Sequence, residues 1–215
     1  MARGINALGS ETDMDEELWE AIRDMMEERA LDKCPVVRVQ ALKTLAQLQD
    51  PEDAECPAIA TICKRMGEDT SADVRKEAIR LVSKNKETIE HIFSRMRDIS
   101  DGVREQVFKT ITETLSFTAL STDQRMALLG CGLRERCPAV RKACLKALNR
   151  WYVDCKNNAA AEAVDGQSQP RSHDGILWLL GVLDVYGEEE EQADTETCVL
   201  ALKALFETPG VEASF

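Results

Sequence analysis

The stretch Cys137-Pro138-Ala139-Val140-Arg141-Lys142-Ala143-Cys144-Leu145 decides the fold, because variants of it recur along the chain. The same frame occupies residues 34–42, and shorter versions surround the Val-Arg pairs at residues 74–75 and 103–104. The four arginines of these frames are 37, 29 and 37 residues apart. A recurring unit of this length predicts a chain built from repeated helix pairs, in which neighbouring pairs stack to bury a shared core.

Each Val-Arg pair opens an apolar helical pattern. Counted from the valine, apolar residues stand four, five and eight positions later, and these offsets lie on one side of a helix. The pattern predicts that this side faces the seams between neighbouring units. The residues concerned are Ala41, Leu42 and Leu45; Ala78, Ile79 and Val82; Val107, Phe108 and Ile111; and Cys144, Leu145 and Leu148.

An acid stands six residues before each arginine. Because the two occur in every unit, we interpret them as scaffold, either in ion pairs between repeats or in hydrogen bonds to helix ends. The pairs are Asp32 and Arg38, Asp69 and Arg75, Asp98 and Arg104, and Glu135 and Arg141.

Between each acid and its arginine lies a residue suited to a helix start, Pro35 and Pro138 at the first turn, and Ser71 and Ser100 as caps.

The predicted fold class is all-α, a HEAT-repeat α-solenoid of about five helix pairs. Residues 1–14 lack periodicity and are expected to be disordered, residues 15–153 form four helix pairs, and residues 154–172 form a loop. A fifth helix pair is expected over residues 173–207, followed by a tail at 208–215. At helix ends we expect Gly67 to act as a C-terminal cap and Thr122 as an N-terminal cap.

The charge is unevenly distributed along the chain. The net charge is −12, yet residues 31–153 carry more bases than acids, and both ends are strongly acidic. This distribution permits a polyanionic partner for the repeats but does not require one, and a solvated helical surface of mixed charge is the favoured interpretation. Nine basic residues are weak candidates for contacts to nucleic-acid phosphates: Lys43, Lys76, Lys84, Lys86, Arg95, Arg97, Lys142, Lys146 and Arg150.

Searches for catalytic and ligand-binding patterns favour a protein that is not an enzyme. The eight cysteines form no C-x-x-C pair or zinc spacing, and His91 and His173 have no nucleophile partner in sequence. No phosphate-binding glycine motif is present. We predict no catalytic, cofactor-binding or metal-binding residues, and no small-molecule substrate. No apolar run approaches 18 residues, so no membrane span is expected.

Several stretches together resemble the HEAT repeats of the condensin G subunit (condensin subunit 3) family. Residues 31–42 resemble that family and are followed by its Leu-Gln-Asp-Pro stop at residues 48–51. Residues 73–78, 97–104 and 132–143 agree in order, and residues 183–186 and 201–206 resemble the next repeat. The resemblance covers about residues 15–207.

The resemblance implies a non-catalytic subunit that binds the kleisin subunit of condensin, and through it the SMC subunits. With the kleisin it implies binding of double-stranded DNA during mitotic chromosome condensation, in the nucleus and on chromosomes beside a cytoplasmic pool. Family members are several times longer than this chain. The alternative is a HEAT- or armadillo-type scaffold or adaptor that binds protein partners without DNA.

Overall fold

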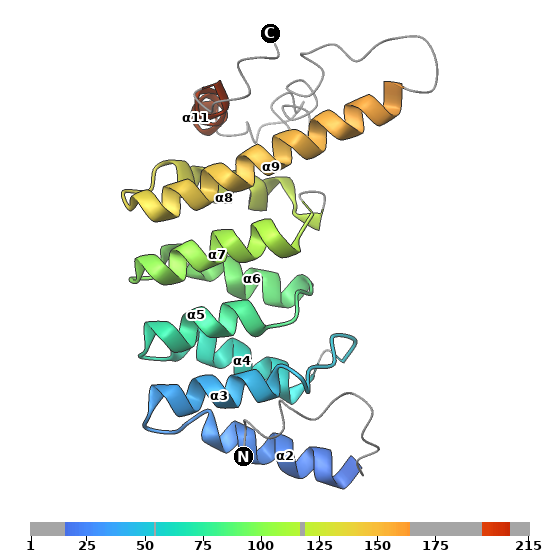
Figure 1. The fold of residues 1–215 in the computed structure, drawn as a ribbon, viewed down its shortest axis with the longest axis vertical. Helices are drawn as coiled ribbons and strands as arrows, with labels where there is room; N and C mark the ends of the chain where they lie inside the picture. The colour runs from blue at the N-terminus through green and yellow to red at the C-terminus, as the bar shows by residue number, and fades with distance from the viewer. Residues whose placement is uncertain (1–15, 54, 117–118, 164–194, 207–215) are drawn as a thin grey trace. The chain divides into compact units, whose positions relative to one another are not determined.

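The computed structural model describes residues 16–53, 55–116, 119–163 and 195–206, and all regular elements in these ranges are helices (Figure 1). The chain divides into two compact units, residues 1–107 and 108–215, with the division inside helix α7 (Asp101–Thr114). The predicted all-α class therefore holds for the described part of the chain.

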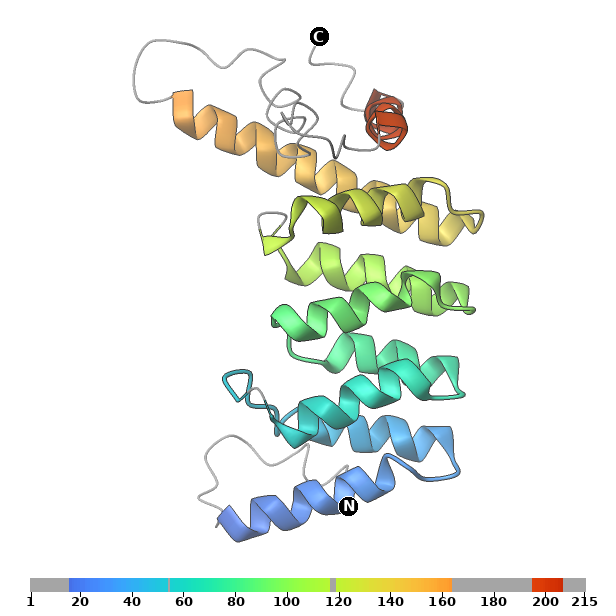
Figure 2. The same ribbon diagram turned by 180° about the vertical axis from the view of Figure 1, so that it is seen from behind.

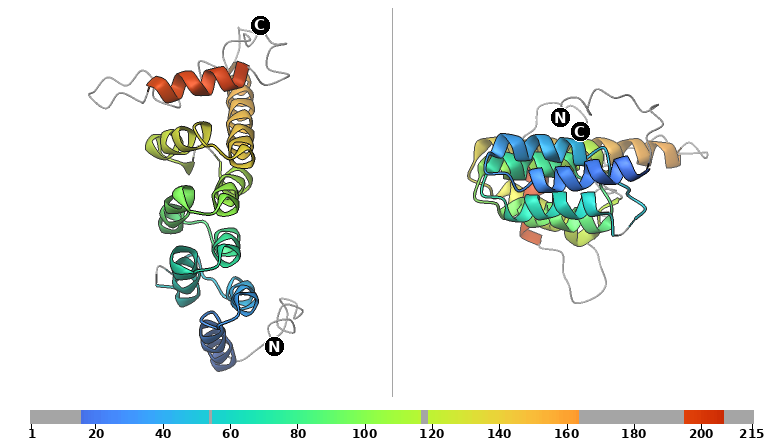
Figure 3. Two further views of the ribbon diagram at one scale, coloured as in Figure 1. Left: turned by 90° about the vertical axis from the view of Figure 1, so that its left-hand side faces the viewer. Right: turned by 90° about the horizontal axis from the view of Figure 1, so that it is seen from below.

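The first unit consists of two layers of antiparallel helices. Figure 3 shows α2, α4 and α6 in one layer and α3 and α5 in the other. In Figure 2, α4 and α6 lie in front of α3 and α5. Helix α5 packs against both α3 and α4, so each pair contacts the next. The elements are α2 (Glu16–Arg29), α3 (Pro35–Leu45), α4 (Pro57–Glu68), α5 (Ala72–Leu81), α6 (Lys86–Ser94) and the 3₁₀ turn η1 (Arg95–Arg97).

The apolar stripes lie at the offsets expected from the sequence. Every predicted seam residue is buried except Leu145, which is half-buried. The valine of the recurring pair is fully buried at Val74, Val103 and Val140, whereas Val37 is 36% exposed. The layer of α2 and α3 is the first that the structure describes, so no earlier described layer covers Val37.

Helix ends in the first unit differ in part from the expected caps. Ser71 occupies the N-cap position of α5, but its side chain makes no capping hydrogen bond. Gly67 lies inside α4, which continues to Glu68, so its expected role as a cap is wrong. Asp69 ends this helix with an extended backbone (ψ 136°), and a left-handed glycine is therefore not required.

The second unit contains the rest of α7, with α8 (Thr122–Leu133), α9 (Pro138–Ala163) and α11 (Thr195–Phe206). Helix α8 packs against α9, and α11 packs against both. The cap of α8 is Ser121 and not Thr122. The Ser121 hydroxyl accepts a hydrogen bond from the Gln124 N–H, and the Gln124 side chain accepts one from the Ser121 N–H. This is a complete capping box, one residue earlier than expected.

The predicted loop at residues 154–172 is wrong for residues 154–163, which belong to helix α9. This helix extends ten residues past the expected boundary, to Ala163. The extension is rich in alanine, the residue with the highest helix propensity, which outweighs the Asn-Asn pair at residues 157–158. The expected disordered segment at 1–14, the rest of the predicted loop, the first helix of the fifth pair and the tail lie outside the described residues.

Gly132 marks the closest packing in the second unit. A Cβ built at this position would lie 2.4 Å from Cys144 Sγ and 2.7 Å from Phe108 Cε1. Cys144 and Phe108 are themselves 0% and 1% exposed. Only a residue without a side chain lets α8 approach α9 and α7 this closely.

We expect Gly132→Ala to destabilise the chain by about 1–3 kcal/mol, because the added methyl group would displace the buried side chains of Cys144 and Phe108. Gly67→Ala is the matched control. A methyl group at residue 67 would have no atom within 4 Å, so helix propensity alone should stabilise that variant, by about 0.5–1 kcal/mol. Urea unfolding monitored by circular dichroism measures both changes. Equal effects of the two substitutions would contradict the packing argument.

Candidate binding surface

The recurring acid caps the turn between the two helices of its own pair. Its side-chain oxygen accepts a backbone N–H two residues later, which closes the turn before the second helix begins. The bonds are Cys34 N–H to Asp32 at 2.8 Å, Ser71 N–H to Asp69 at 2.8 Å, Ser100 N–H to Asp98 at 2.9 Å and Cys137 N–H to Glu135 at 3.2 Å.

The recurring arginine also binds the turn of its own pair. Its Nη1 donates to the backbone carbonyl of the acid six residues earlier, at 2.8 Å for Arg38, 2.8 Å for Arg75 and 2.7 Å for Arg104. This contact places the guanidinium group across the turn, with its other edge directed away from it.

In Arg38 and Arg75, the other edge of the guanidinium group reaches the acid of the next helix pair, whereas Arg104 Nη2 donates to Asp101 of its own helix at 2.7 Å. Arg38 donates from Nε and Nη2 to the two carboxylate oxygens of Asp69, at 2.7 and 2.6 Å. Arg75 makes the same paired contact with Asp98, at 2.8 and 2.7 Å. These four side chains are between 1% and 9% exposed. The first unit thus holds a ladder in which one arginine binds two consecutive turns.

The ladder shifts the pKa values of its acids downward. Burial by itself would raise the pKa of Asp69, but hydrogen bonds from Arg38 and from the Ser71 N–H, with the nearby arginine charges, hold it below its usual value. The pKa of Asp98 is lowered in the same way by Arg75 and the Ser100 N–H. Both acids are therefore charged in the folded chain at neutral pH.

Asp32 and Arg141 differ from the inner members of the ladder. The Asp32 side chain is 29% exposed, and its ion pair is a long one, to Arg29 at 4.0 Å. Arg141 is exposed, whereas Arg38 and Arg75 are 7% and 5% exposed. Within the described residues, neither Asp32 nor Arg141 makes the bidentate pair seen between Arg38 and Asp69.

Gln49 provides a second link between pairs that the sequence analysis missed. Its side-chain nitrogen donates to the carbonyls of Ala46 and Leu81, both at 3.0 Å, and its oxygen accepts the Ser83 N–H at 2.7 Å. Gln49 thereby satisfies backbone groups at the ends of α3 and α5. The only signal in the sequence is its place in the Leu-Gln-Asp-Pro stop.

Four of the nine candidate cations bind other groups of the chain. Lys84 donates to the carbonyls of Arg80 and Val82 at the end of α5, and burial lowers its pKa. Arg150 donates to the Thr112 carbonyl at 2.6 Å, in the last turn of α7. Arg95 donates to the Gly67 carbonyl, and Lys43 pairs with Glu77 at 3.7 Å.

The other five candidates are exposed: Lys76 on α5, Lys86 on α6 and Arg97 in η1, and Lys142 and Lys146 on α9. Lys142 and Lys146 are four residues apart on one helix, so they lie on the same face. Arg97 lines a pocket beside η1, whereas Lys76 and Lys86 are not among its lining residues.

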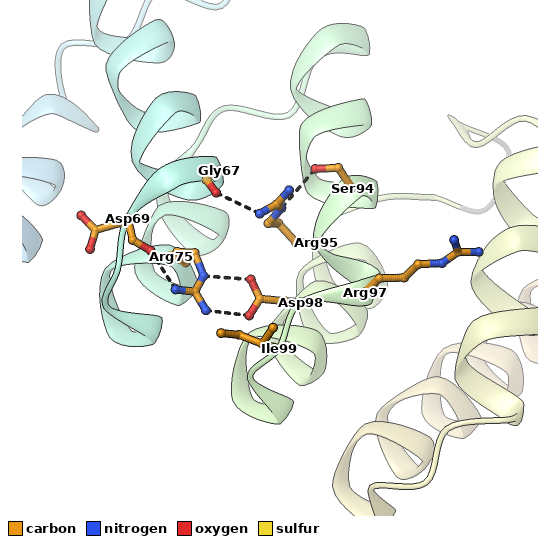
Figure 4. A pocket seen from close by; sticks show the side chains of 8 residues that line it. All are labelled: Gly67, Asp69, Arg75, Ser94, Arg95, Arg97, Asp98 and Ile99. Atoms are coloured by element: carbon orange, nitrogen blue, oxygen red, sulfur yellow. Dashed lines mark hydrogen bonds and ion pairs between the residues drawn. The ribbon is translucent and has the colours of Figure 1, made fainter.

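One pocket in the first unit lies where η1 meets the end of α4 (Figure 4). Its volume is about 280 Å³. The Arg75–Asp98 pair forms one wall, Arg95 spans from Ser94 to the Gly67 carbonyl, and the guanidinium group of Arg97 is directed away from the Arg75–Asp98 pair. The lining residues are Gly67, Asp69, Arg75, Ser94, Arg95, Arg97, Asp98 and Ile99.

Cysteine and histidine side chains in the described ranges form no metal-binding group with the acids. Burial raises the pKa of Cys63 to about 11 and that of Cys144 to about 12, so both are protonated thiols that pack as small apolar groups. Within the same ranges, no helix combines the length and apolar character that crossing a bilayer requires.

Comparison with known proteins identifies one group of relatives. Condensin complex subunit 3 of Homo sapiens is 29% identical over 202 residues, which cover 94% of this chain and 18% of the human protein. The Xenopus laevis subunit is 31% identical over 193 residues, covering 90% of this chain and 16% of that protein. No protein-family model matches the chain.

A crystal structure of the Schizosaccharomyces pombe condensin Cnd3–Cnd2 subcomplex has the same fold. It matches with a TM-score of 0.77 and 25% identity, over 95% of this chain and 25% of that chain. The predicted HEAT-repeat fold and the resemblance to condensin subunit 3 are therefore confirmed. The chain spans less than a fifth of the length of these two vertebrate relatives.

Arg75→Met should destabilise the chain by about 3–5 kcal/mol, because it leaves the buried Asp98 carboxylate without its partner. Arg80→Met, on the same helix, is the control. Arg80 pairs with Glu77 but is 54% exposed, so its loss should cost about 1 kcal/mol or less. Equilibrium urea unfolding at pH 7 measures both losses of stability. Similar losses in the two variants would show that the buried Arg75–Asp98 pair stabilises the chain no more than the exposed Arg80–Glu77 pair does.

Acid should remove the contribution of the ladder. The pKa values of Asp69 and Asp98 lie below the ordinary value of 3.8 in the folded chain, so the stability they provide is complete above pH 3.8 and is lost as pH falls through the folded values. The unfolding free energy of the native chain should therefore drop steeply below pH 4.

In Arg75→Met, the Asp98 carboxyl is buried without a cation, and protonation relieves that penalty. The difference in stability between this variant and the native chain should consequently shrink as pH falls from 5 to 3. Urea unfolding across this pH range measures the difference. A stability difference that stays constant over this pH range would mean that the protonation of Asp98 is not coupled to its pairing with Arg75.

Proposed function

We propose that this chain, which is similar to condensin complex subunit 3 along nearly its whole length, is a HEAT-repeat segment of a condensin-type complex. In this role it binds the kleisin subunit and contributes to DNA binding in mitotic chromosome condensation. The observation that carries the proposal is the match to the Cnd3–Cnd2 subcomplex, a structure of two condensin subunits together, over 95% of the chain.

Kleisin binding is the central part of the proposal. Stacked helix pairs present long, continuous surfaces that suit extended partner segments. Through the kleisin the chain is linked to the SMC subunits, and the complex acts in the nucleus and on chromosomes, with a cytoplasmic pool. Support comes from the two vertebrate relatives, both of which carry the name condensin complex subunit 3.

DNA binding is proposed as a contribution of exposed cations in the presence of the kleisin. Lys76, Lys86 and Arg97 in the first unit, and Lys142 and Lys146 in the second, are free of the capping roles that occupy Lys84 and Arg150. Such side chains bind phosphates without reading sequence. A chain of net charge −12 binds DNA weakly alone, so a second subunit is part of the proposal.

The proposal assigns no catalytic role to this chain. Asp69 and Asp98 are saturated by arginines and backbone N–H groups, and their lowered pKa values make them poor general bases. The described thiols with raised pKa values are likewise poor nucleophiles.

A second candidate is a HEAT-type adaptor that binds proteins and not DNA. Two observations favour it, the acidic net charge and the use of four candidate cations within the chain itself. The two candidates differ in one measurable property, a salt-sensitive affinity for duplex DNA.

The test is a pull-down of the purified chain with a kleisin fragment, followed by a DNA mobility-shift assay at two salt concentrations. We expect the chain and the kleisin to co-elute, and their complex to bind duplexes of unrelated sequence with an affinity that falls as salt rises. Lys142→Glu with Lys146→Glu should weaken DNA binding by about tenfold or more, while kleisin binding is retained.

Lys33→Glu with Lys64→Glu is the matched control, because it makes the same change in charge at two exposed lysines outside the candidate set. This variant should retain DNA binding. Retained kleisin binding with no DNA affinity would favour the adaptor, and loss of both partners would reject the condensin role.

A further inference from the structure

The turn before α7 differs from the equivalent turns of the other repeats. The residue after the recurring acid is Lys33, Thr70 or Arg136 in those turns, but here it is Ile99. Ile99 is 92% exposed, more than any other large hydrophobic residue in the described ranges. Because it recurs in no other unit and packs against nothing that would bury it, the scaffold gives no reason for it.

The same turn carries two arginines before the acid, Arg95 and Arg97. The positions equivalent to Arg95 hold Arg29, Met66 and Gly132, and those equivalent to Arg97 hold Leu31, Glu68 and Arg134. This turn alone therefore combines both arginines with an exposed aliphatic residue. All three line the pocket between η1 and α4 (Figure 4).

The two acids of the pocket form their hydrogen bonds with other arginines. Both carboxylate oxygens of Asp98 accept hydrogen bonds from Arg75, and one also accepts the Ser100 N–H. Asp69 is occupied in the same way by Arg38 and the Ser71 N–H. Each acid is thus hydrogen-bonded to a buried arginine of the ladder, and Arg95 adds a coulombic attraction to Asp98. The pocket is still lined by more arginines than acids.

Arg95 is held in place by the chain. Its Nη1 donates to the Gly67 carbonyl at 3.0 Å, and its Nε donates to the Ser94 hydroxyl at 3.2 Å. Among the described residues, no acceptor engages its Nη2. A guanidinium group fixed in this way loses little side-chain entropy when it binds an oxyanion.

The dimensions of the pocket limit what it can take. About 280 Å³ lies just below the range of pockets that enclose a whole small-molecule ligand, and it suits one or two side chains. The exposed Ile99 on the rim adds an apolar contact beside the cation. A row of DNA phosphates offers no aliphatic group to pack on Ile99, whereas a peptide with an aliphatic residue next to its anionic residue does.

We propose that the pocket lined by Arg95 and Ile99 is a docking site for a linear peptide in which an oxyanion side chain is followed by an aliphatic residue. The oxyanion is a phosphate ester or a carboxylate, and it contacts Arg95, while the aliphatic side chain packs on Ile99. Arg97, whose guanidinium group is directed away from the Arg75–Asp98 pair, contributes only long-range attraction. This site goes beyond the kleisin and DNA roles proposed above.

Fluorescence anisotropy of the full chain tests the site with three labelled octapeptides that differ at one position: phosphoserine, glutamate or serine, each followed by leucine. We expect binding of the phosphoserine peptide, the glutamate peptide or both, with at least tenfold weaker binding of the serine peptide. Arg95→Gln and Ile99→Ser should each weaken binding about tenfold or more, while Arg97→Gln should cause less than a threefold loss.

Lys76→Gln is the matched control, because it removes one charge from an exposed lysine on α5 outside the pocket. It should leave the affinity unchanged, as should Lys142→Glu with Lys146→Glu, which separates this site from DNA binding. Circular dichroism and thermal unfolding establish that each variant is folded, and Ile99→Ser removes the apolar contact without placing a charge beside Arg95.

Several results would overturn the site. One is equal binding of all three peptides, and another is no binding by any of them. A third is a loss of affinity in Lys76→Gln as large as that in Arg95→Gln, which would indicate diffuse attraction. Competition by duplex DNA that depends on Arg95 and not on Ile99 would reassign the pocket to nucleic acid.

Discussion

The contact on which the first unit depends is a single guanidinium group shared between two consecutive turns. Arg38 and Arg75 each bind the carbonyl of their own turn and the carboxylate of the next. A buried ion pair contributes little net stability when its full desolvation is counted, yet breaking one side of it is costly. The ladder therefore acts mainly on register. It fixes the distance and rotation between neighbouring pairs, while the apolar seams supply the driving force for stacking.

Repetition made the scaffold predictable, but it could not show how the repeats are joined. The spacing of acid and arginine indicated a structural role in every unit, and the periodicity placed the seam residues correctly. The partner of each arginine was not evident, because the sequence-adjacent acid offers only its backbone carbonyl. The carboxylate comes from 31 residues away for Arg38 and from 23 residues away for Arg75. Contacts of this kind depend on the packing of whole helices.

The errors of the sequence-based prediction lie at helix ends, where weak local preferences compete. Asn157 and Asn158 suggest a loop, but the following alanines carry α9 to Ala163. Ser121 and Thr122 are both good caps, and the reciprocal bond from Gln124 decides between them. The candidate cations show the same limit. Whether a lysine binds a ligand or caps a helix depends on which carbonyls lie near it, and periodicity carries no information on that point.

The ladder also determines where function can reside. The inner members of the ladder are held by their neighbours, and their charges are already balanced, as Asp69 and Asp98 illustrate. A partner must therefore be recognised by side chains that break the repeat. Ile99 is of this kind, because the equivalent positions hold Lys33, Thr70 and Arg136, and it can change without loss of the buried seams. An interaction surface on a repeat scaffold is for this reason best sought by aligning the units with one another and asking what only one of them carries.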